Sequence, residues 1–248
     1  MKNETTAIAE KISTNLNWED LVLNDQTTKQ VSSITQSIKN NTSSKRSIPK
    51  SGIRILFYGP SGTGKTLTAT LIGKQLNLEV YRVDLALVVS KYIGETEKNL
   101  EALFTEASSR NWILFFDEAD ALFGKRTDVK DAHDKYANQE VSYLLQRIEN
   151  YNGIIILASN LKANIDDAFI RRLHAVIHFP LPEEKERLKL WQRAIPAGIG
   201  SKALQLEQLA SRYELSAGAI NKAARDGEFI KQENPTQEQL IAAIKRLG

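Results

Sequence analysis

A glycine-rich octapeptide near residue 60 carries the clearest chemical signature in the chain. It reads Gly-Pro-Ser-Gly-Thr-Gly-Lys-Thr and matches the pattern G-x-x-x-x-G-K-[ST] at every fixed position. Glycines let the backbone pass close to phosphate oxygens, so that successive N–H groups can wrap a triphosphate. The octapeptide therefore predicts a phosphate-binding loop, made of Gly59, Pro60, Ser61, Gly62, Thr63, Gly64, Lys65 and Thr66.

The end of this loop supplies side chains with specific tasks. We expect Lys65 to face the β- and γ-phosphates and Thr66 to offer its hydroxyl to Mg²⁺. Leu67 and Leu71 continue at helical spacing. The loop is therefore expected to open a helix whose N-terminal dipole favours the anion, with Leu67 still part of the nucleotide-binding segment.

A second candidate group follows an apolar run. Residues 113–116 are Ile-Leu-Phe-Phe, and Asp117 and Glu118 come directly after them. Open α/β sheets bind ligands at the carboxyl ends of their strands, where this pair would lie. Asp117 suits the Mg²⁺ shell, and Glu118 suits a base that orients the attacking water. Asn160, after a later apolar run, could reach the γ-phosphate or its water; a turn-forming asparagine is the alternative.

Composition sets broad limits on the other chemistry. The absence of cysteine excludes disulfides and thiolate metal sites. The three histidines are too scattered to suggest a zinc site. A net charge of +3 does not demand a nucleic-acid surface. No run approaches the roughly 18 apolar residues of a membrane span, and the N-terminus lacks a signal-peptide core, so we expect a cytoplasmic protein.

The order of apolar patterns predicts three segments. Residues 1–50 are polar, with an apolar docking knot at 18–23. Val31, Ile34 and Ile38 recur at helical spacing and predict an amphipathic helix. Residues 51–181 indicate an α/β subdomain with five parallel strands, flanking helices and an exposed loop at 124–137. The flanking helices include one that begins at Glu95 and a short one over 166–172. Residues 182–248 contain four helical patterns, typical of a small helical lid. The five strands are expected at 53–58, 80–83, 113–116, 153–157 and 175–179.

This order of features resembles that of the AAA+ ATPases. It is most similar to the AAA subgroup of katanin, spastin and the vacuolar-sorting disassembly enzymes, and to compact bacterial AAA proteins. The resemblance covers about residues 18–248 and implies a P-loop NTPase fold with ATP and Mg²⁺ as cofactors. It makes residues 59–66 the Walker A loop, Asp117 and Glu118 the Walker B pair, and Asn160 the sensor 1 residue.

The resemblance also implies a homo-oligomer, typically a hexameric ring. Arg171 and Arg172 match the paired arginines that the family inserts into a neighbouring subunit's nucleotide site. Residues 124–135 would be a second pore loop. The first pore loop, which grips an extended polypeptide, would consist of Lys91, Tyr92, Ile93 and Gly94.

These features favour an ATP-hydrolysing motor that disassembles or unfolds protein clients by threading. Two alternatives stay open: a DNA-acting loader, and a slowly hydrolysing scaffold that assembles on ATP. Aspartates interleaved with the lysines of 124–135 argue against DNA. Where many relatives have a lid arginine, this chain has Asn221 and Lys222, so lid sensing by a guanidinium is not expected. The family's N-terminal recruiting domain would be reduced to residues 1–50 at most, so client recruitment is expected to depend on an adaptor or on another protein.

Overall fold

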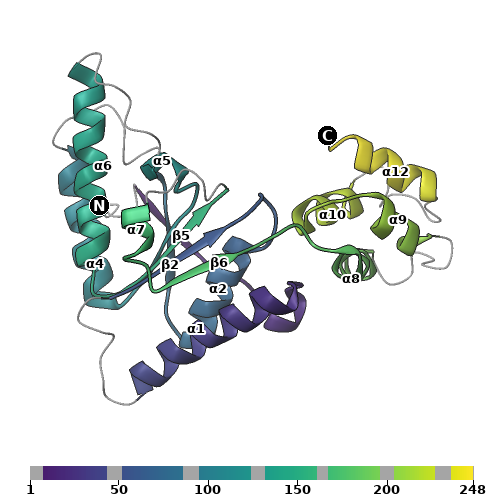
Figure 1. Cartoon of the computed structure of the whole chain (residues 1–248), viewed down its shortest axis with the longest axis horizontal. Coiled ribbons are helices and arrows are strands. Elements are labelled where there is room, and N and C mark those ends of the chain that lie inside the picture. The colour runs from purple at the N-terminus through teal and green to yellow at the C-terminus, as the bar shows by residue number, and fades with distance from the viewer. Residues whose placement is uncertain are drawn as a thin grey trace. The chain divides into compact units, whose positions relative to one another are not determined.

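The chain forms two compact units (Figure 1). The sheet unit comprises residues 1–18, 29–58 and 65–178, and the helical unit comprises residues 19–28, 59–64 and 179–248. The predicted phosphate-binding loop is therefore divided: its first six residues belong to the helical unit, and Lys65 and Thr66 belong to the sheet unit. The computed structural model describes residues 8–43, 52–85, 95–123, 132–160, 167–195, 204–226 and 236–247.

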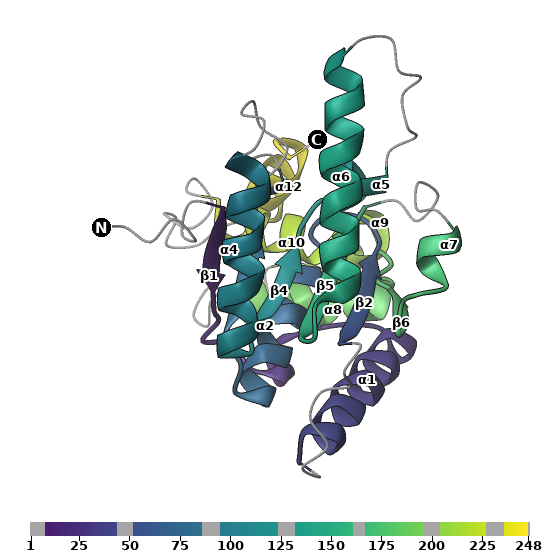
Figure 2. The same ribbon diagram turned by 90° about the vertical axis from the view of Figure 1, so that its left-hand side faces the viewer.

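The sheet has six strands in the order β1-β3-β4-β5-β2-β6 (Figures 1 and 2). Five of them run parallel, as predicted. The residues of β4 and β5 are all buried, as expected of parallel strands covered on both faces. The strands are β1 (Ala9–Ile12), β2 (Ile53–Tyr58), β3 (Val80–Val83), β4 (Ile113–Phe116), β5 (Ile154–Ser159) and β6 (Ala175–His178).

Strand β1 was not predicted, and it makes the sheet mixed. It runs antiparallel to β3, with Ala9 opposite Val83. On its exposed side Arg82 pairs with Glu10 at 2.7 Å. The strand is only four residues long and lies in a polar stretch, so its sequence carries too little alternation to indicate a strand.

Parallel register brings the candidate carboxylates and amide to one edge of the sheet. Phe116, the last residue of β4, lies opposite Leu157 of β5, which continues for two more residues to Ser159. Asp117 follows β4 and Asn160 follows β5. The two side chains therefore leave the sheet at neighbouring positions on its carboxyl edge.

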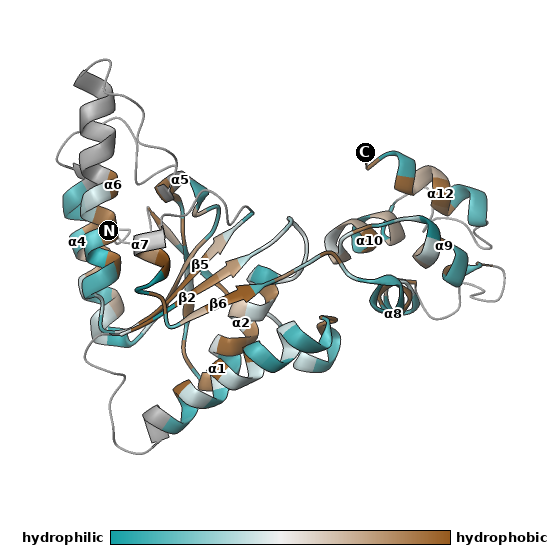
Figure 3. Cartoon of the chain, viewed as in Figure 1, coloured by the Kyte–Doolittle hydropathy of each residue, from teal (hydrophilic) through white to brown (hydrophobic). Residues whose placement is uncertain are grey.

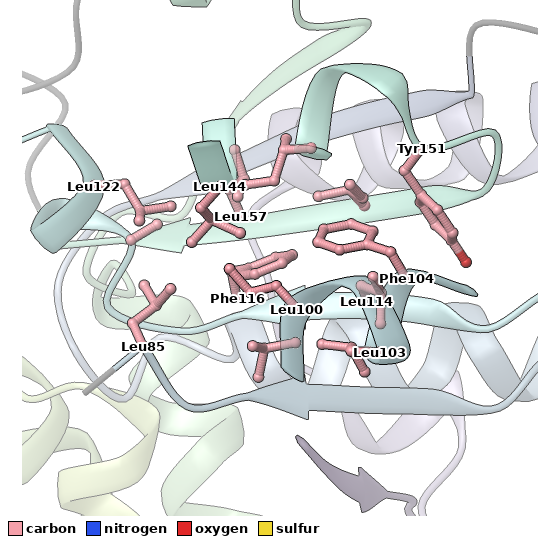
Figure 4. Packing of buried hydrophobic residues seen from close by; sticks show 14 of the residues in the cluster. Leu85, Leu100, Leu103, Phe104, Leu114, Phe116, Leu122, Leu144, Tyr151 and Leu157 are labelled. Atoms are coloured by element: carbon pink, nitrogen blue, oxygen red, sulfur yellow. The ribbon is translucent and has the colours of Figure 1, made fainter. Parts of the chain in front are cut away.

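Helices α4 (Glu95–Arg110) and α6 (Ala132–Asn150) cover one face of the sheet (Figure 2). Figure 4 shows their contribution to the core, where Leu100 and Phe104 of α4 and Leu144 of α6 meet side chains of the strands. Phe116 and Leu157, the last apolar residues before the candidate site, belong to the same cluster. The ends of β4 and β5 that carry the candidate site residues are therefore held by a well-packed hydrophobic core.

Helices α1 (Asp25–Ser43) and α2 (Lys65–Leu76) both carry apolar residues among polar ones (Figure 3). Val31 and Ile38 of α1 are buried, which confirms the helix predicted around them. Helix α2 packs closely on the sheet, because a Cβ atom on Gly73 would lie 2.3 Å from a methyl carbon of Val80.

Two boundaries differ from the predictions. The loop expected over 124–137 is wrong at its end, because α6 already begins at Ala132. Residues 132–137 lack an apolar stripe, but extending an existing helix costs far less than starting one. The short helix predicted up to Arg172 ends earlier: α7 covers Asp167–Ile170, and the two arginines follow it. A short helix α5 (Asp120–Phe123) follows β4.

The helical unit has its own core, which centres on the fully buried Trp191. The first turn of its helix at residues 217–224 is capped by a side chain, because the Ser216 hydroxyl accepts a hydrogen bond from the Ala219 N–H at 3.2 Å. No helix in the described parts of the chain is long and apolar enough to cross a membrane. The four predicted helical patterns correspond to α8 (Glu184–Ala194), α9 (Leu206–Arg212), α10 (Ala217–Ala224) and α12 (Gln237–Lys245).

Candidate active site

The loop of residues 59–64 presents bare backbone. Gly59, Gly62 and Gly64 have φ angles of +142°, +75° and +101°, which residues with side chains seldom adopt. A Cβ atom on Gly59 would also lie 2.0 Å from the carbonyl oxygen of Phe179. The loop can therefore take this path only with glycine at these positions.

Helix α10 lies against this loop. The N–H of Gly218 donates to the carbonyl of Gly62 at 2.8 Å. A Cβ atom on Gly218 would lie 3.1 Å from the Cα atom of Gly62, so two glycines are needed for the approach. The first turn of α10 is thus bound to the backbone that is expected to wrap phosphate.

A pocket in the helical unit adjoins the same loop. The pocket is small, and its lining combines apolar side chains with the polar Asn24, Thr27 and Glu186. It includes part of the predicted docking knot as well as residues before α8 and at the start of α10. Lining residues are Val22, Leu23, Thr63, Leu181, Pro182 and Ala217.

In the sheet unit Lys65 meets Asn160. The Lys65 Nζ atom donates to Asn160 Oδ1 at 3.3 Å, joining the start of α2 to the end of β5. The lysine side chain is buried, and this burial lowers its pKa, while the charges of Asp117 and Asp120 act in the opposite direction. Two residues predicted to handle the terminal phosphate are therefore in contact.

Glu118 has a strained backbone. Its φ of +51° is left-handed, which costs a residue with a side chain roughly 1–2 kcal/mol. The Glu118 N–H donates to Asp117 Oδ1 at 3.0 Å, and the Ala119 N–H donates to the carbonyl of Ala158 at 2.8 Å. These bonds hold the turn while the Glu118 side chain stays exposed, free to reach a water molecule.

Asp120 is a site residue that sequence reasoning missed. Its two carboxylate oxygens accept hydrogen bonds from the Ser159 hydroxyl and, at 3.1 Å, from the backbone N–H of Asn160. Asp120 therefore fixes the residue that contacts Lys65. The available signal was a third carboxylate two residues after Glu118, but its partners lie about forty residues further along the chain.

The two arginines lie in the turn after α7 and are both exposed. The Arg172 N–H donates to the carbonyl of Phe169 at 2.9 Å, and its guanidinium pairs with Glu149 in the last turn of α6. Arg171 makes no hydrogen bond or ion pair with any residue in the described ranges. The two neighbours therefore differ: one is anchored and the other is available.

Comparison with known proteins identifies the family. A family model described as "ATPase family associated with various cellular activities (AAA)" matches residues 55–181, about half of the chain. The match includes Lys65, Glu118 and Asn160. The chain belongs to the AAA ATPase family. A second model, described as "Contractile injection system ATPase helical domain", matches residues 183–246 of this AAA protein, the region of α8 to α12.

Curated relatives match most of this AAA protein. The ATPase family gene 2 protein of Schizosaccharomyces pombe is 38% identical over 200 residues, which cover 77% of this chain and 23% of the relative. The uncharacterized AAA family ATPase y4kL of Sinorhizobium fredii is 33% identical over 176 residues, 70% of this chain and 53% of the relative. The chain thus spans about a quarter and about half of the length of these two relatives.

A solved structure supports the same fold. The crystal structure of the FIGL-1 AAA domain in complex with ADP superposes with a TM-score of 0.73 at 20% identity, covering 100% of this chain and 91% of that chain. The predicted α/β P-loop fold with a C-terminal helical domain is therefore confirmed.

Other predicted site residues of this AAA protein add less. Asn221 and Lys222 are both exposed on α10. The first pore loop, predicted at Lys91, Tyr92, Ile93 and Gly94, lies outside the described residues, as does the 124–131 part of the second. Their gripping role stays a prediction.

Proposed function

We propose that this AAA protein binds ATP with Mg²⁺ and hydrolyses it to ADP and phosphate. The observation that carries the proposal is the 3.3 Å contact between Lys65 Nζ and Asn160 Oδ1. It joins a cation for the terminal phosphates to an amide that can hold a water, at the sheet edge where Asp117 and Glu118 also emerge. Phosphoryl transfer needs this kind of positioning more than covalent help from the protein.

Each side chain would have a separate task. Lys65 neutralises the β- and γ-phosphates, and because it is buried and poorly solvated it gains from a phosphate partner. Asn160 orients the water, and Glu118 accepts a proton from it as the water oxygen attacks the γ-phosphorus. The bond from that phosphorus to the bridging oxygen then breaks, and ADP leaves with the electron pair.

Thr66 and Asp117 are the residues that would hold Mg²⁺. Both offer oxygen, the donor that Mg²⁺ prefers. Asp117 uses Oδ1 to accept the Glu118 N–H, and its Oδ2 has no hydrogen bond to any residue that the structure describes. When bound, the ion would supply positive charge that neutralises the charge developing on the phosphate oxygens.

The adenine base would pack against the apolar side chains beside this small pocket. Val22 and Leu23 on one side and Leu181 on the other offer apolar surface beside Thr63 of the phosphate-binding loop. A base stacked there would lie next to backbone suited to phosphate. The role proposed for the docking knot at 18–23 is thus to help to enclose the nucleotide.

The site would be completed by a second copy of the chain. Arg171 is exposed and has no partner among the described residues, whereas a guanidinium at a transferring phosphoryl group raises its rate by roughly 10³ to 10⁵. A surface that donates this arginine and a different surface that receives it make a heterologous contact, which closes into a ring or continues as a spiral. We infer a ring, hexameric as in the family.

The client would be a protein of a contractile injection system. The match of residues 183–246 to the helical domain of such ATPases supports this assignment. ATP hydrolysis would then remodel or disassemble a component of the injection particle, and threading past Tyr92 and Ile93 is the proposed means. The small net charge of +3 gives no support to a nucleic-acid client.

A trapping experiment tests this function. Glu118→Gln should bind ATP but turn it over slowly, so it should retain its client. We expect ATP-dependent enrichment of an injection-particle protein from cells that make the particle. The double variant Lys65→Ala/Glu118→Gln is the matched control, because it should not bind ATP and should retain nothing.

Two results would overturn the proposal. Normal turnover by Glu118→Gln would remove the role of Glu118. Salt-sensitive stimulation of the wild-type ATPase by DNA, without enrichment of any particle protein, would favour a DNA-acting loader instead.

A further inference from the structure

A buried arginine links strand β2 to the end of α6. Arg54, the second residue of β2, is 5% exposed. Its Nε atom donates to the carbonyl of Ile148 at 2.9 Å, and its Nη2 atom donates to the carbonyl of Glu149. Carbonyls in the last turn of a helix have no partner within the helix. Arg54 therefore satisfies the end of α6 and fixes it to the sheet.

The backbone of Arg54 is bound by His174. The Arg54 N–H donates to His174 Nδ1 at 3.1 Å, and the His174 N–H donates to the Arg54 carbonyl at 2.8 Å. In a regular parallel pair the partners on both sides are backbone groups of the neighbouring strand. Here an imidazole replaces one carbonyl, so the chain before His174 leaves the ladder. The turn that carries Arg171 and Arg172 therefore ends at His174, where the regular pairing of β2 with β6 starts.

Glu149 completes the connection. Its carbonyl accepts from Arg54, and its carboxylate pairs with Arg172. The turn of residues 171–174 is thus attached at His174 to β2 and at Arg172 to α6. Arg171, between attached neighbours, keeps its side chain exposed and without a partner in the described ranges. The contacts of His174 and Arg172 thus fix the turn while the Arg171 guanidinium stays exposed.

We propose that Arg54 and His174 are positioning residues for the arginine that each subunit offers to its neighbour's nucleotide site. This inference rests on the proposed function, since it requires completion of the site by a second copy. Strand β2 ends at Tyr58, directly before the phosphate-binding loop. The strand that leads to the subunit's own loop would therefore also position the arginine for the neighbouring site. Loss of Arg54 should therefore impair the neighbour's hydrolysis and spare the subunit's own ATP binding.

Mixing of variants separates these effects. Arg54→Met keeps a long side chain but removes the donors to α6. Alone, it should lose ATP turnover by at least about tenfold, with the Kd for a fluorescent ATP analogue within about threefold of wild type. Mixed with an equal amount of Glu118→Gln, which should hydrolyse ATP only slowly but has an intact Arg171, it should regain at least about a third of wild-type turnover per Arg54→Met subunit.

Two control variants show whether a loss of turnover is specific to the arginine exchange. Arg171→Ala, mixed in the same way, should also be rescued by Glu118→Gln. Arg82→Met is the matched arginine variant: it removes a strand arginine that pairs with Glu10, away from the turn. Its turnover should stay within about twofold of wild type, as for other exposed ion pairs.

Rescue of both Arg171→Ala and Arg54→Met supports the inference. Rescue of Arg171→Ala alone overturns it, because the damage by Arg54→Met then lies in its own site. Failure to rescue Arg171→Ala, or full activity of that variant alone, overturns the arginine exchange itself and the inference with it.

A second pair of variants serves if Arg54→Met does not fold. His174→Leu removes the acceptor for the Arg54 N–H, whereas His174→Asn keeps an oxygen near the position of Nδ1. We expect His174→Leu to lose turnover and to be rescued by Glu118→Gln, and His174→Asn to keep at least about a third of wild-type turnover. Equal, wild-type turnover of the two variants contradicts the positioning role.

Discussion

At the scale of single residues, charged groups at the carboxyl edge of the sheet hold one another in place. Lys65 is buried, and the carboxylates of Asp117 and Asp120 counter the resulting decrease of its pKa. Asp120 also binds the backbone N–H of Asn160. One carboxylate thus stabilises the lysine charge and fixes the amide that meets it, so the site is ordered before a nucleotide arrives.

Replacement of Asp120 should affect turnover more than binding. In Asp120→Ala the Ser159 hydroxyl and the Asn160 N–H lose their acceptor, so Asn160 would no longer hold the water firmly. We expect kcat to fall at least about tenfold and KM for ATP to stay within about threefold, measured by steady-state phosphate release. Asp226→Ala is the control, because it removes a carboxylate that pairs with Arg246 in the helical unit. A loss as large in the control would contradict the specific role of Asp120.

The ring of His174 gives stability a dependence on pH. Burial and the charge of Arg54 lower its pKa below the ordinary 6.5. Above about pH 6.5 the ring is largely neutral in both the folded and the unfolded chain. As the pH falls below it, the unfolded chain takes up the proton first, so the free energy of unfolding decreases.

His174→Asn should remove this dependence, because it keeps an acceptor that does not titrate. In urea unfolding between pH 8 and pH 5.5, the wild type should lose more stability than the variant, and the difference should grow below about pH 6.5. Parallel curves for the two proteins would show that protonation of this ring is not coupled to folding.

What the sequence revealed at this scale depends on distance along the chain. The phosphate-binding loop and the pair Asp117 and Glu118 are contiguous, and their chemistry is visible in residue types alone. The partners of Asp120 lie about forty residues away, and those of Arg54 roughly a hundred. Arg54 looked only like an interruption of an apolar strand, because nothing local indicates that it binds the end of α6.

At the scale of elements, the site depends on how closely α2 packs on the sheet. Lys65 and Thr66 begin α2, and the helix position is set by Gly73, where a Cβ atom would lie 2.3 Å from a Val80 methyl carbon and 2.9 Å from the Leu78 carbonyl oxygen. The backbone contact leaves little room for adjustment. The spacing between helix and strand therefore requires a residue without a side chain.

Gly73→Ala should destabilise the fold by about 1–3 kcal/mol, the usual cost of overpacking, although alanine favours a helix. The measurement is the free energy of unfolding in urea. Gln75→Ala, at an exposed position of the same helix, is the control and should change stability by less than about 0.5 kcal/mol. An unchanged or raised stability in Gly73→Ala would mean that α2 can move away from β3 without cost.

Prediction of elements succeeded where periodicity was strong. The five parallel strands, α4 and the four helices of the lid were visible as apolar runs or stripes. Strand β1 was not predicted, because it is pairing with β3, and not an apolar pattern of its own, that makes these residues a strand. The start of α6 at Ala132 was not predicted, because its first residues are polar and lack an apolar stripe.

At the scale of the whole molecule, the proposed enzyme needs a second copy of the chain to complete each site. Arg171 is exposed and has no partner among the described residues, so it could serve the proposed site of Lys65 and Asn160 in a second copy. The donor and receiver surfaces differ, so copies would join head to tail. Assembly and hydrolysis are then one coupled property, and dilution should remove both.

The most direct measurement is ATP turnover per subunit as a function of protein concentration, with the assembly state followed by mass photometry. We predict that turnover rises with the fraction of assembled chains to a plateau, and that Arg171→Ala stays at least about a hundredfold lower at every concentration. Constant turnover per subunit down to the monomer, or an Arg171→Ala variant as active as the wild type, would contradict the central claim that a neighbouring subunit completes each site.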